Sequence, residues 1–162
     1  MIPGNNMLAI AFVLSFCILY ANADCPDGYM KHQGSCYRFH HSEFTWPEAV
    51  SFCHAFNAHL LKLETEAEFI FVKGKAKEAG GDGYWTGGSD AVEENNWVWA
   101  ETGTALTLTN DWGTGEPDHV SGRDCLGIWG AGDFKLGAYD CRHLLRPICE
   151  VDIETPAQGI VG

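Results

Sequence analysis

Two carboxylates flank a proline in the segment Glu116-Pro117-Asp118, shortly before Cys125. A proline fixes φ, and when its peptide bond is cis it turns both side chains toward one point in a tight bend. Oxygen ligands on a rigid turn are what calcium selects, so these residue types suit a hard cation. A solvated surface turn is the other interpretation, because Gly, Pro and Asp are the commonest turn formers. On the tripeptide alone the surface turn is favoured, so the interpretation depends on the surrounding cysteine framework.

Histidines near acidic side chains are the other candidates for chemistry. None of them has the spacing of a known catalytic triad or zinc site, so we expect a binding protein rather than an enzyme. His119 gains from its position beside Asp118, where it could contact a ligand. The candidates are His40-His41 with Glu43, the pair His54 and His59, and Asp118-His119.

The cysteine count indicates disulfides. Cys17 lies in the N-terminal apolar segment, and six cysteines remain after it. An even number without C-x-x-C spacing favours disulfides over a zinc site, and spacing alone leaves all fifteen pairings of six cysteines open. The six are Cys25, Cys36, Cys53, Cys125, Cys141 and Cys149.

The first residues have the pattern of a secretion signal. Residues 1–23 carry no acidic or basic side chain, 8–20 are apolar, and Ala21-Asn22-Ala23 supplies the small-x-small cleavage pattern. The apolar run is too short for a comfortable membrane span, and no later segment is apolar enough to cross a bilayer. We therefore expect a secreted protein with a signal peptide at 1–23, one domain at 24–151 and a flexible tail at 152–162.

The formal net charge is −12, and all of it lies after residue 23. Such a surface repels nucleic acid and anionic membranes, and suits calcium, cationic partners or neutral ligands. Plain solubility is the favoured explanation, since the acidic residues are scattered.

Two amphipathic helices are predicted in the N-terminal half. In Thr45-Trp46-Pro47-Glu48 the threonine caps the helix and the glutamate closes a capping box, so a helix should run toward Phe56. A second box, Thr65 with Glu68, starts another helix that Gly80-Gly81 stops. The residues expected to face inward are Ala49, Cys53 and Phe56 on the first helix, and Phe69, Val72, Ala76 and Ala79 on the second.

After Gly83 the sequence consists of short aromatic and apolar runs separated by turn residues. This pattern predicts strands. A segment of more than twenty residues, 100–124, separates two of them and contains Glu116-Pro117-Asp118. So long a loop inside one domain is usually functional. The predicted strands are 84–87, 97–99, 125–129 and 147–151.

Together these motifs resemble the C-type lectin domain. The resemblance is carried by the order of the six cysteines, the two early helices and four motifs, and it covers Cys25 to about Val151. Its overall character is most similar to the small, secreted, perlucin-like lectins of marine invertebrates. The motifs are Tyr84-Trp85-Thr86-Gly87-Gly88, Trp97-Val98-Trp99, Trp112-Gly113-Thr114-Gly115-Glu116-Pro117-Asp118, and Cys125 followed by Cys141 and Cys149.

The resemblance implies the α+β C-type lectin fold, with two helices, a small antiparallel sheet joining the termini and a second sheet supporting the long loops. It also implies three disulfides, the second of which would tie the first helix to the last strand. The implied pairs are Cys25 with Cys36, Cys53 with Cys149, and Cys125 with Cys141.

The function implied by the resemblance is glycan binding through calcium, which coordinates two vicinal sugar hydroxyls while its own ligands hydrogen-bond them. In this family Glu-Pro-Asn goes with mannose-like sugars and Gln-Pro-Asp with galactose-like sugars. This chain has the first residue of the mannose motif, Glu116, and the last residue of the galactose motif, Asp118. The sugar class therefore stays open.

The chain departs from the family pattern at three positions. Arg123 stands where the family has a further acidic ligand, although Asp124 is beside it, and Gly137 and Ala138 replace an Asn and an Asp. Calcium takes six to eight oxygen ligands. The remaining candidate ligands are Glu116, Asp118 and Asp124, with Asp140 or Asp133 as displaced substitutes.

Two hypotheses follow. In the favoured one the domain binds glycans, with a weakened calcium site or with the sugar held directly by Glu116, Asp118 and Arg123. In the other the domain binds protein or mineral surfaces, and Arg123 pairs with Glu116 or Asp118 in place of the metal. Trp129 is the candidate sugar-facing aromatic residue, whereas Trp85, Trp97, Trp99 and Trp112 are expected in the core. Oligomeric state and biological role, whether innate immunity, adhesion or biomineralisation, stay open.

Overall fold

The chain places two helices around a set of short strands that centres on its C-terminal strand. The structure is a computed structural model that describes residues 24–108 and 110–153. The predicted signal peptide at 1–23 and most of the predicted tail lie outside the described residues. The helices are α1 (Trp46–His54) and α2 (Glu66–Ala79), with a 3-10 turn η1 (Gly130–Gly132). The strands are β1 (Met30–His32), β2 (Ser35–Phe39), β3 (His59–Leu60), β4 (Gly83–Ser89), β5 (Val98–Trp99), β6 (Thr104–Ala105), β7 (Cys125–Trp129), β8 (Lys135–Tyr139) and β9 (Arg146–Asp152).

Helix α1 begins at the predicted capping box. The Glu48 carboxylate accepts hydrogen bonds from the backbone N–H of Thr45 at 3.0 Å and from its hydroxyl at 2.7 Å. Ala49 and Cys53 are fully buried, as predicted. The prediction was wrong for Phe56, which lies beyond the end of the helix and is 47% exposed, because the helix ends at His54 before the next inward position.

Helix α2 forms only half of the predicted capping box. The Thr65 hydroxyl accepts the backbone N–H of Glu68 at 3.2 Å. The Glu68 carboxylate does not return to Thr65 and instead turns inward, where it accepts the Tyr37 hydroxyl at 2.6 Å and the Glu64 N–H at 2.7 Å. Glu68 is therefore a buried acid that joins α2 to β2. The inward face is otherwise apolar, with Phe69, Val72 and Ala76 buried.

Strand β9 connects the two halves of the sheet system. It pairs antiparallel with β2 and with the two-residue strand β3, while its first residues pair parallel with β4. Strand β4 in turn pairs antiparallel with β5 and β7, and β7 pairs with β8. The sheet is therefore mixed: β1, β2 and β9 pair antiparallel, as the family resemblance implied for the sheet that joins the termini, and Trp85 and Pro147 form the parallel contact. Strand β9 also includes Asp152, which the sequence analysis placed in the tail.

The core consists of two packed clusters. One lies against α2 and includes Tyr84, Leu126 and Ile148, and the other lies against α1 and includes Trp85 and Leu145. The predicted core positions of the tryptophans are confirmed: three are buried, and Trp112 is partly buried against the α2 cluster. The buried three are Trp85, Trp97 and Trp99.

Three disulfides join the elements in the pairing that the family resemblance implied. One ties α1 to β9 across 96 residues of sequence, and another closes the long-loop end by joining β7 to the turn after β8. The pairs are Cys25–Cys36, Cys53–Cys149 and Cys125–Cys141.

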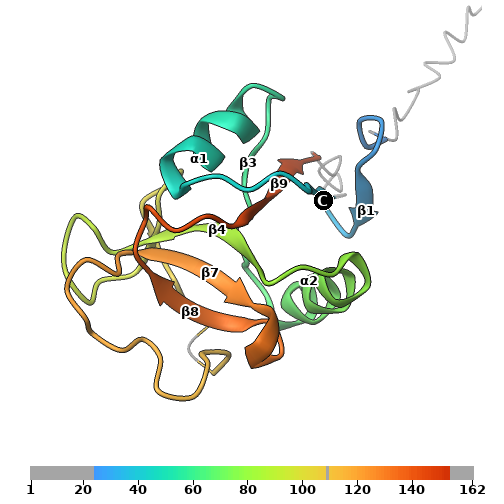
Figure 1. Cartoon of the computed structure of the whole chain (residues 1–162). Coiled ribbons are helices and arrows are strands. Elements are labelled where there is room, and N and C mark those ends of the chain that lie inside the picture. Colours follow the sequence, from blue (N-terminus) through green and yellow to red (C-terminus); the bar gives the residue numbers. More distant parts are fainter. Residues whose placement is uncertain (1–23, 109, 154–162) are drawn as a thin grey trace, which may run out of the picture.

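The strand β1 and the end of β9 lie at one side of the molecule, and the long segment that follows β6 lies at the opposite side, next to β7 and β8 (Figure 1). Within the described residues, neither helix is long and apolar enough to cross a bilayer. The long segment after β6 is therefore separated from the side of the molecule where β1 and the end of β9 lie.

Candidate functional site

The long loop is attached to the free edge of β8. The Gly113 N–H donates to the Leu136 carbonyl at 2.8 Å, and the Leu136 N–H donates to the Asp111 carbonyl at 3.0 Å. The Glu116 carboxylate extends this ladder, because its Oε2 accepts the Ala138 N–H at 3.0 Å. The Glu116–Pro117 peptide bond is cis. One carboxylate of the predicted pair, that of Glu116, is therefore hydrogen-bonded to the backbone of β8.

The second carboxylate of the pair contacts Arg123. The Asp118 Oδ2 forms an ion pair with the Arg123 guanidinium, and its Oδ1 accepts the Val120 N–H at 3.2 Å. The Arg123 N–H donates to the Val120 carbonyl at 3.1 Å, which closes the turn between the two charged residues. The Asp118 side chain is 25% exposed and that of Arg123 is 46% exposed, so the pair lies at the surface.

Two adjoining hollows flank Glu116. They have volumes of about 340 Å³ and about 280 Å³, and both are lined by Glu116, Trp129 and Tyr139. Trp129, at the end of β7, is 52% exposed. Arg123 and His143 line the larger hollow only, and Lys135 lines the smaller only. The arrangement places an exposed indole next to a carboxylate, a guanidinium and a phenol.

Tyr139 occupies the space beside Gly137. A Cβ atom added at Gly137 would lie 3.2 Å from the Tyr139 ring and 3.3 Å from its hydroxyl. Burial raises the pKa of the Tyr139 phenol well above its ordinary value, and the nearby Glu116 carboxylate raises it further while Arg123 lowers it. The phenol therefore stays protonated and can both donate and accept a hydrogen bond.

The two displaced substitute ligands are already held by cations. Asp140 accepts from Arg142 through the backbone N–H at 2.9 Å and the guanidinium at 2.5 Å, and these contacts hold its pKa well below the usual range. Asp133 pairs with Lys77 at 2.5 Å and with Lys73 at 3.5 Å. Both carboxylates thus have partners other than a metal ion.

Asp124 and His119 lie near a buried acid that the sequence analysis did not single out, Asp90. Asp90 is 5% exposed, and among the described residues its Oδ1 has no hydrogen-bond partner. Burial raises the Asp90 pKa, the N–H of Asn95 lowers it, and the charge of Asp124 raises it again. The His119 ring contacts the Asn95 side chain. In the sequence, Asp90 could have been recognised from its position directly after the apolar run that forms the buried strand β4.

The three predicted calcium ligands therefore have separate environments. Glu116 accepts a hydrogen bond from the backbone of β8, and Asp118 forms an ion pair with Arg123. Asp124 is close enough to Asp90 for its charge to raise the Asp90 pKa. Within residues 24–108 and 110–153, one group of three or more His, Cys, Asp or Glu residues brings its ligand atoms within 4.8 Å of one another, and it lies on β3 and β9.

Comparison with known proteins identifies similar sequences and folds. A family model described as "Lectin C-type domain" matches residues 42–151. Perlucin of Haliotis laevigata is 32% identical over 129 residues, which are 78% of this chain and 82% of perlucin. C-type lectin domain family 10 member A of Homo sapiens is 35% identical over 119 residues, which are 74% of this chain and only 33% of that protein. Among solved structures, SPL-1 in complex with GlcNAc is similar with a TM-score of 0.74 and 29% identity, covering 83% of this chain and 99% of the other.

Proposed function

We propose, from the premise that this chain belongs to the C-type lectin domain family, that it binds glycans at the two hollows around Glu116, Trp129 and Tyr139 without a calcium ion bridging the sugar. The family is one of binding domains and is not enzymatic, in agreement with the sequence analysis. SPL-1, a similar protein, has been solved with GlcNAc.

The observation that carries the proposal is the exposed Trp129 beside Glu116 and Arg123. A sugar presents an apolar face of C–H groups and an edge of hydroxyl groups. An indole suits the face, and carboxylate and guanidinium groups suit the edge, because they accept and donate strong hydrogen bonds. The Tyr139 phenol adds a group that can do both.

The contacts of Glu116 and Asp118 argue against calcium between them. One Glu116 oxygen is used by the Ala138 N–H, and Asp118 is neutralised by Arg123. Positions 137 and 138 offer no side-chain oxygen, and Tyr139 fills the space that a larger residue at 137 would need. Calcium requires more oxygen ligands than this surface supplies.

Asp90 and Asp124 are the other acids of this region that we infer a calcium ion would use, with backbone carbonyls and water completing its oxygen ligands. The Asp90 Oδ1 has no hydrogen-bond partner among the described residues, and burial raises the Asp90 pKa although the Asn95 N–H and His119 lower it, so this acid could accept further positive charge. A cation there would supply that charge and hold the loop that carries His119. The calcium ion would order this loop without touching the sugar, and protein side chains would make the contacts with the sugar.

Protein or mineral surfaces are the second candidate ligands. The Arg123–Asp118 ion pair favours this alternative, since it fills the place where the family uses a metal to reach the sugar. The net charge of −12 would suit a calcium-bearing mineral or a cationic protein.

The deciding experiment is calorimetric titration of mannose- and galactose-type sugars in EDTA and in calcium. We expect one sugar class to bind in both buffers, and Trp129→Ala to weaken binding by about tenfold or more. Phe56→Ala is the matched control, because Phe56 is an exposed aromatic residue outside the hollows. If no sugar binds in either buffer, the second candidate is favoured.

Calcium titration of Arg123→Glu tests the role of the ion pair. The substitution restores an acid at this position and releases Asp118. A gain in calcium affinity over the unmodified chain would support the view that Arg123 displaces the metal. An unchanged affinity would count against Arg123 as the blocking residue.

The pattern at residues 1–23 and the three disulfides support secretion as part of the proposal. Recognition of foreign glycans in innate immunity is a role that such a secreted lectin would fit. Expression of the full chain in cultured cells, with assay of the medium, tests secretion directly. Retention of the chain inside the cell would argue against it.

A further inference from the structure

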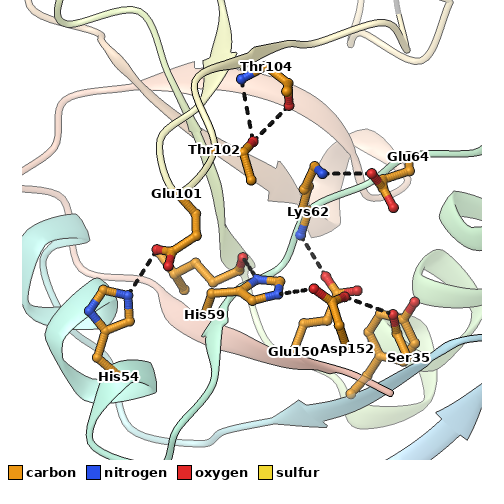
Figure 2. A network of polar contacts seen from close by, with 12 residues as sticks. Ser35, His54, His59, Lys62, Glu64, Glu101, Thr102, Thr104, Glu150 and Asp152 are labelled. Atoms are coloured by element: carbon orange, nitrogen blue, oxygen red, sulfur yellow. Dashed lines mark hydrogen bonds and ion pairs between the residues drawn. The ribbon is translucent and has the colours of Figure 1, made fainter. Parts of the chain in front are cut away.

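A second cluster of polar side chains lies where β3 meets β9, at the end of β9 that Figure 1 places away from the long loop. It consists of His59, Glu150 and Asp152, whose ligand atoms all lie within 4.8 Å of one another. His59 is directly opposite Glu150 in the antiparallel register, and Asp152 is two residues further along the same strand. Figure 2 shows the imidazole and the two carboxylates gathered at one point.

Each of the three side chains is oriented by a contact outside the group. The His59 Nδ1 is 2.9 Å from the Leu60 carbonyl, which can only accept, so Nδ1 carries a proton and Nε2 faces Asp152 Oδ2 at 3.4 Å. The Glu150 Oε2 accepts the Lys62 N–H at 2.8 Å, and the Asp152 Oδ1 accepts the Ser35 hydroxyl at 3.3 Å. Such outer contacts orient metal ligands and fix the histidine tautomer.

The charge of the cluster also calls for a cation. Glu150 is 3% exposed, and the Lys62 N–H is a neutral donor to its carboxylate. The carboxylate of the buried Glu68 lies close enough to add negative charge around Glu150. The Lys62 ammonium pairs with Glu64 at 2.6 Å instead of with Glu150. Two carboxylates and an imidazole nitrogen, all acceptors, thus face one another.

We propose that His59, Glu150 and Asp152 form a binding site for a divalent transition-metal ion, for which Zn²⁺ is the best-fitting occupant. An imidazole nitrogen with two carboxylates is a ligand set for zinc rather than for calcium, which takes oxygen ligands only. At zinc bond lengths of about 2.1 Å, neighbouring ligand atoms in a tetrahedron lie about 3.4 Å apart. The separation of His59 Nε2 from Asp152 Oδ2 already has this value.

All three ligand atoms lie within 4.8 Å of one another, and Asp152 is the member of the group that is free to adjust. Its side chain is 75% exposed, so it can rotate toward the ion, whereas His59 is 16% exposed and Glu150 is fixed in the sheet. The fourth position of the zinc ion is left for water. Bound there, the ion joins β3 to the end of β9 and stabilises the last strand independently of the glycan site.

The test is calorimetric titration of Zn²⁺ into the metal-free full chain, followed by thermal unfolding with and without zinc. We expect one zinc ion per chain, a rise in Tm, and affinity lowered at least about tenfold by either His59→Ala or Asp152→Asn. The control is His54→Ala, which removes a surface histidine on α1 that contacts Glu101 and lies outside the group. Cobalt as a spectroscopic probe should give the visible absorption of a four-coordinate ion.

Three results would overturn the site. These are absence of zinc binding to the unmodified chain, equal weakening by His54→Ala, and zinc binding that persists unchanged in Asp152→Asn. The last variant changes an exposed side chain at the end of β9, so it keeps the proposal testable if His59→Ala fails to fold. A result in which His59 and Asp152 are joined only by a proton would appear as pH-dependent stability without any effect of zinc.

Discussion

His40 should make the protein lose stability as the pH falls, and the size of the loss can be estimated from its surroundings. Its ring packs edge-on against Phe52, with the ring centroids 4.7 Å apart, and stacks on Phe56, with the centroids 6.0 Å apart. The buried Nε2 has no hydrogen-bond partner among the described residues. Burial, followed by the charges of Arg38 and His41, lowers the His40 pKa from 6.5 to about 4.

The direction of the effect follows from the two protonation states. Because the folded-state pKa lies below the unfolded-state pKa, the unfolded chain binds the extra proton first as the pH falls. The contribution of neutral His40 is therefore complete above the unfolded value of 6.5 and is lost progressively down to about pH 4. The full pKa difference corresponds to about 3 kcal/mol, and partial exposure of the ring reduces our expectation to about 1 to 2 kcal/mol.

The assay compares urea unfolding at about pH 7.5 and about pH 4.5 in three chains: the unmodified protein, His40→Phe and His41→Asn. Phenylalanine keeps the aromatic packing and cannot titrate, so His40→Phe should retain about 1 to 2 kcal/mol more of its neutral-pH stability at the lower pH. His41 is exposed and its charge is the smallest of the three causes, so His41→Asn should lose nearly as much stability as the unmodified protein. An identical acid loss in His40→Phe would show that His40 is not the group responsible.

Three further predictions concern stability. Replacing Cys53 and Cys149 together by alanine opens a loop of 96 residues, so we expect a loss of about 4 to 5 kcal/mol in the chain-entropy account, measured by urea unfolding; a loss under about 1 kcal/mol would contradict that account. Gly88→Ala should cost about 1 to 3 kcal/mol, because the new Cβ would lie 2.5 Å from the buried Leu126 side chain, and an unchanged Tm would show that the core can yield there. Trp129→Ala should change the free energy of unfolding by less than about 0.5 kcal/mol, since the exposed indole serves a ligand, and a large loss would assign it to the core.

The helices were predictable because their signals are local. The caps at Thr45 and Thr65 and the stop at Gly80 each act within one turn of the chain, and the structure confirms both starts. The hydrogen-bond partner of the Glu68 side chain was not predictable from a local signal. It turns from the cap to Tyr37, a partner 31 residues away, and no local pattern encodes that choice.

Strand β8 escaped prediction for a related reason. Its residues 135–139 contain a glycine and an alanine and no β-branched side chain, so their strand conformation is imposed by β7 on one side and by the loop on the other. The same long-range contacts determine the candidate site. The sequence identified Arg123 as a partner for one of two acids, and only the fold distinguishes Asp118, which binds it, from Glu116, which binds β8.

The position of β9 at the centre of the strand system has a consequence for how the chain is made. Synthesis proceeds from the N-terminus, so the strand that pairs with β2, β3 and β4 is the last part of the fold to leave the ribosome. Until then β2 and β4 lack a neighbour, and Cys53 lacks its partner Cys149. The domain therefore cannot complete its folding before Arg146–Asp152 has been made, and a chain truncated before Arg146 should yield no stable fragment.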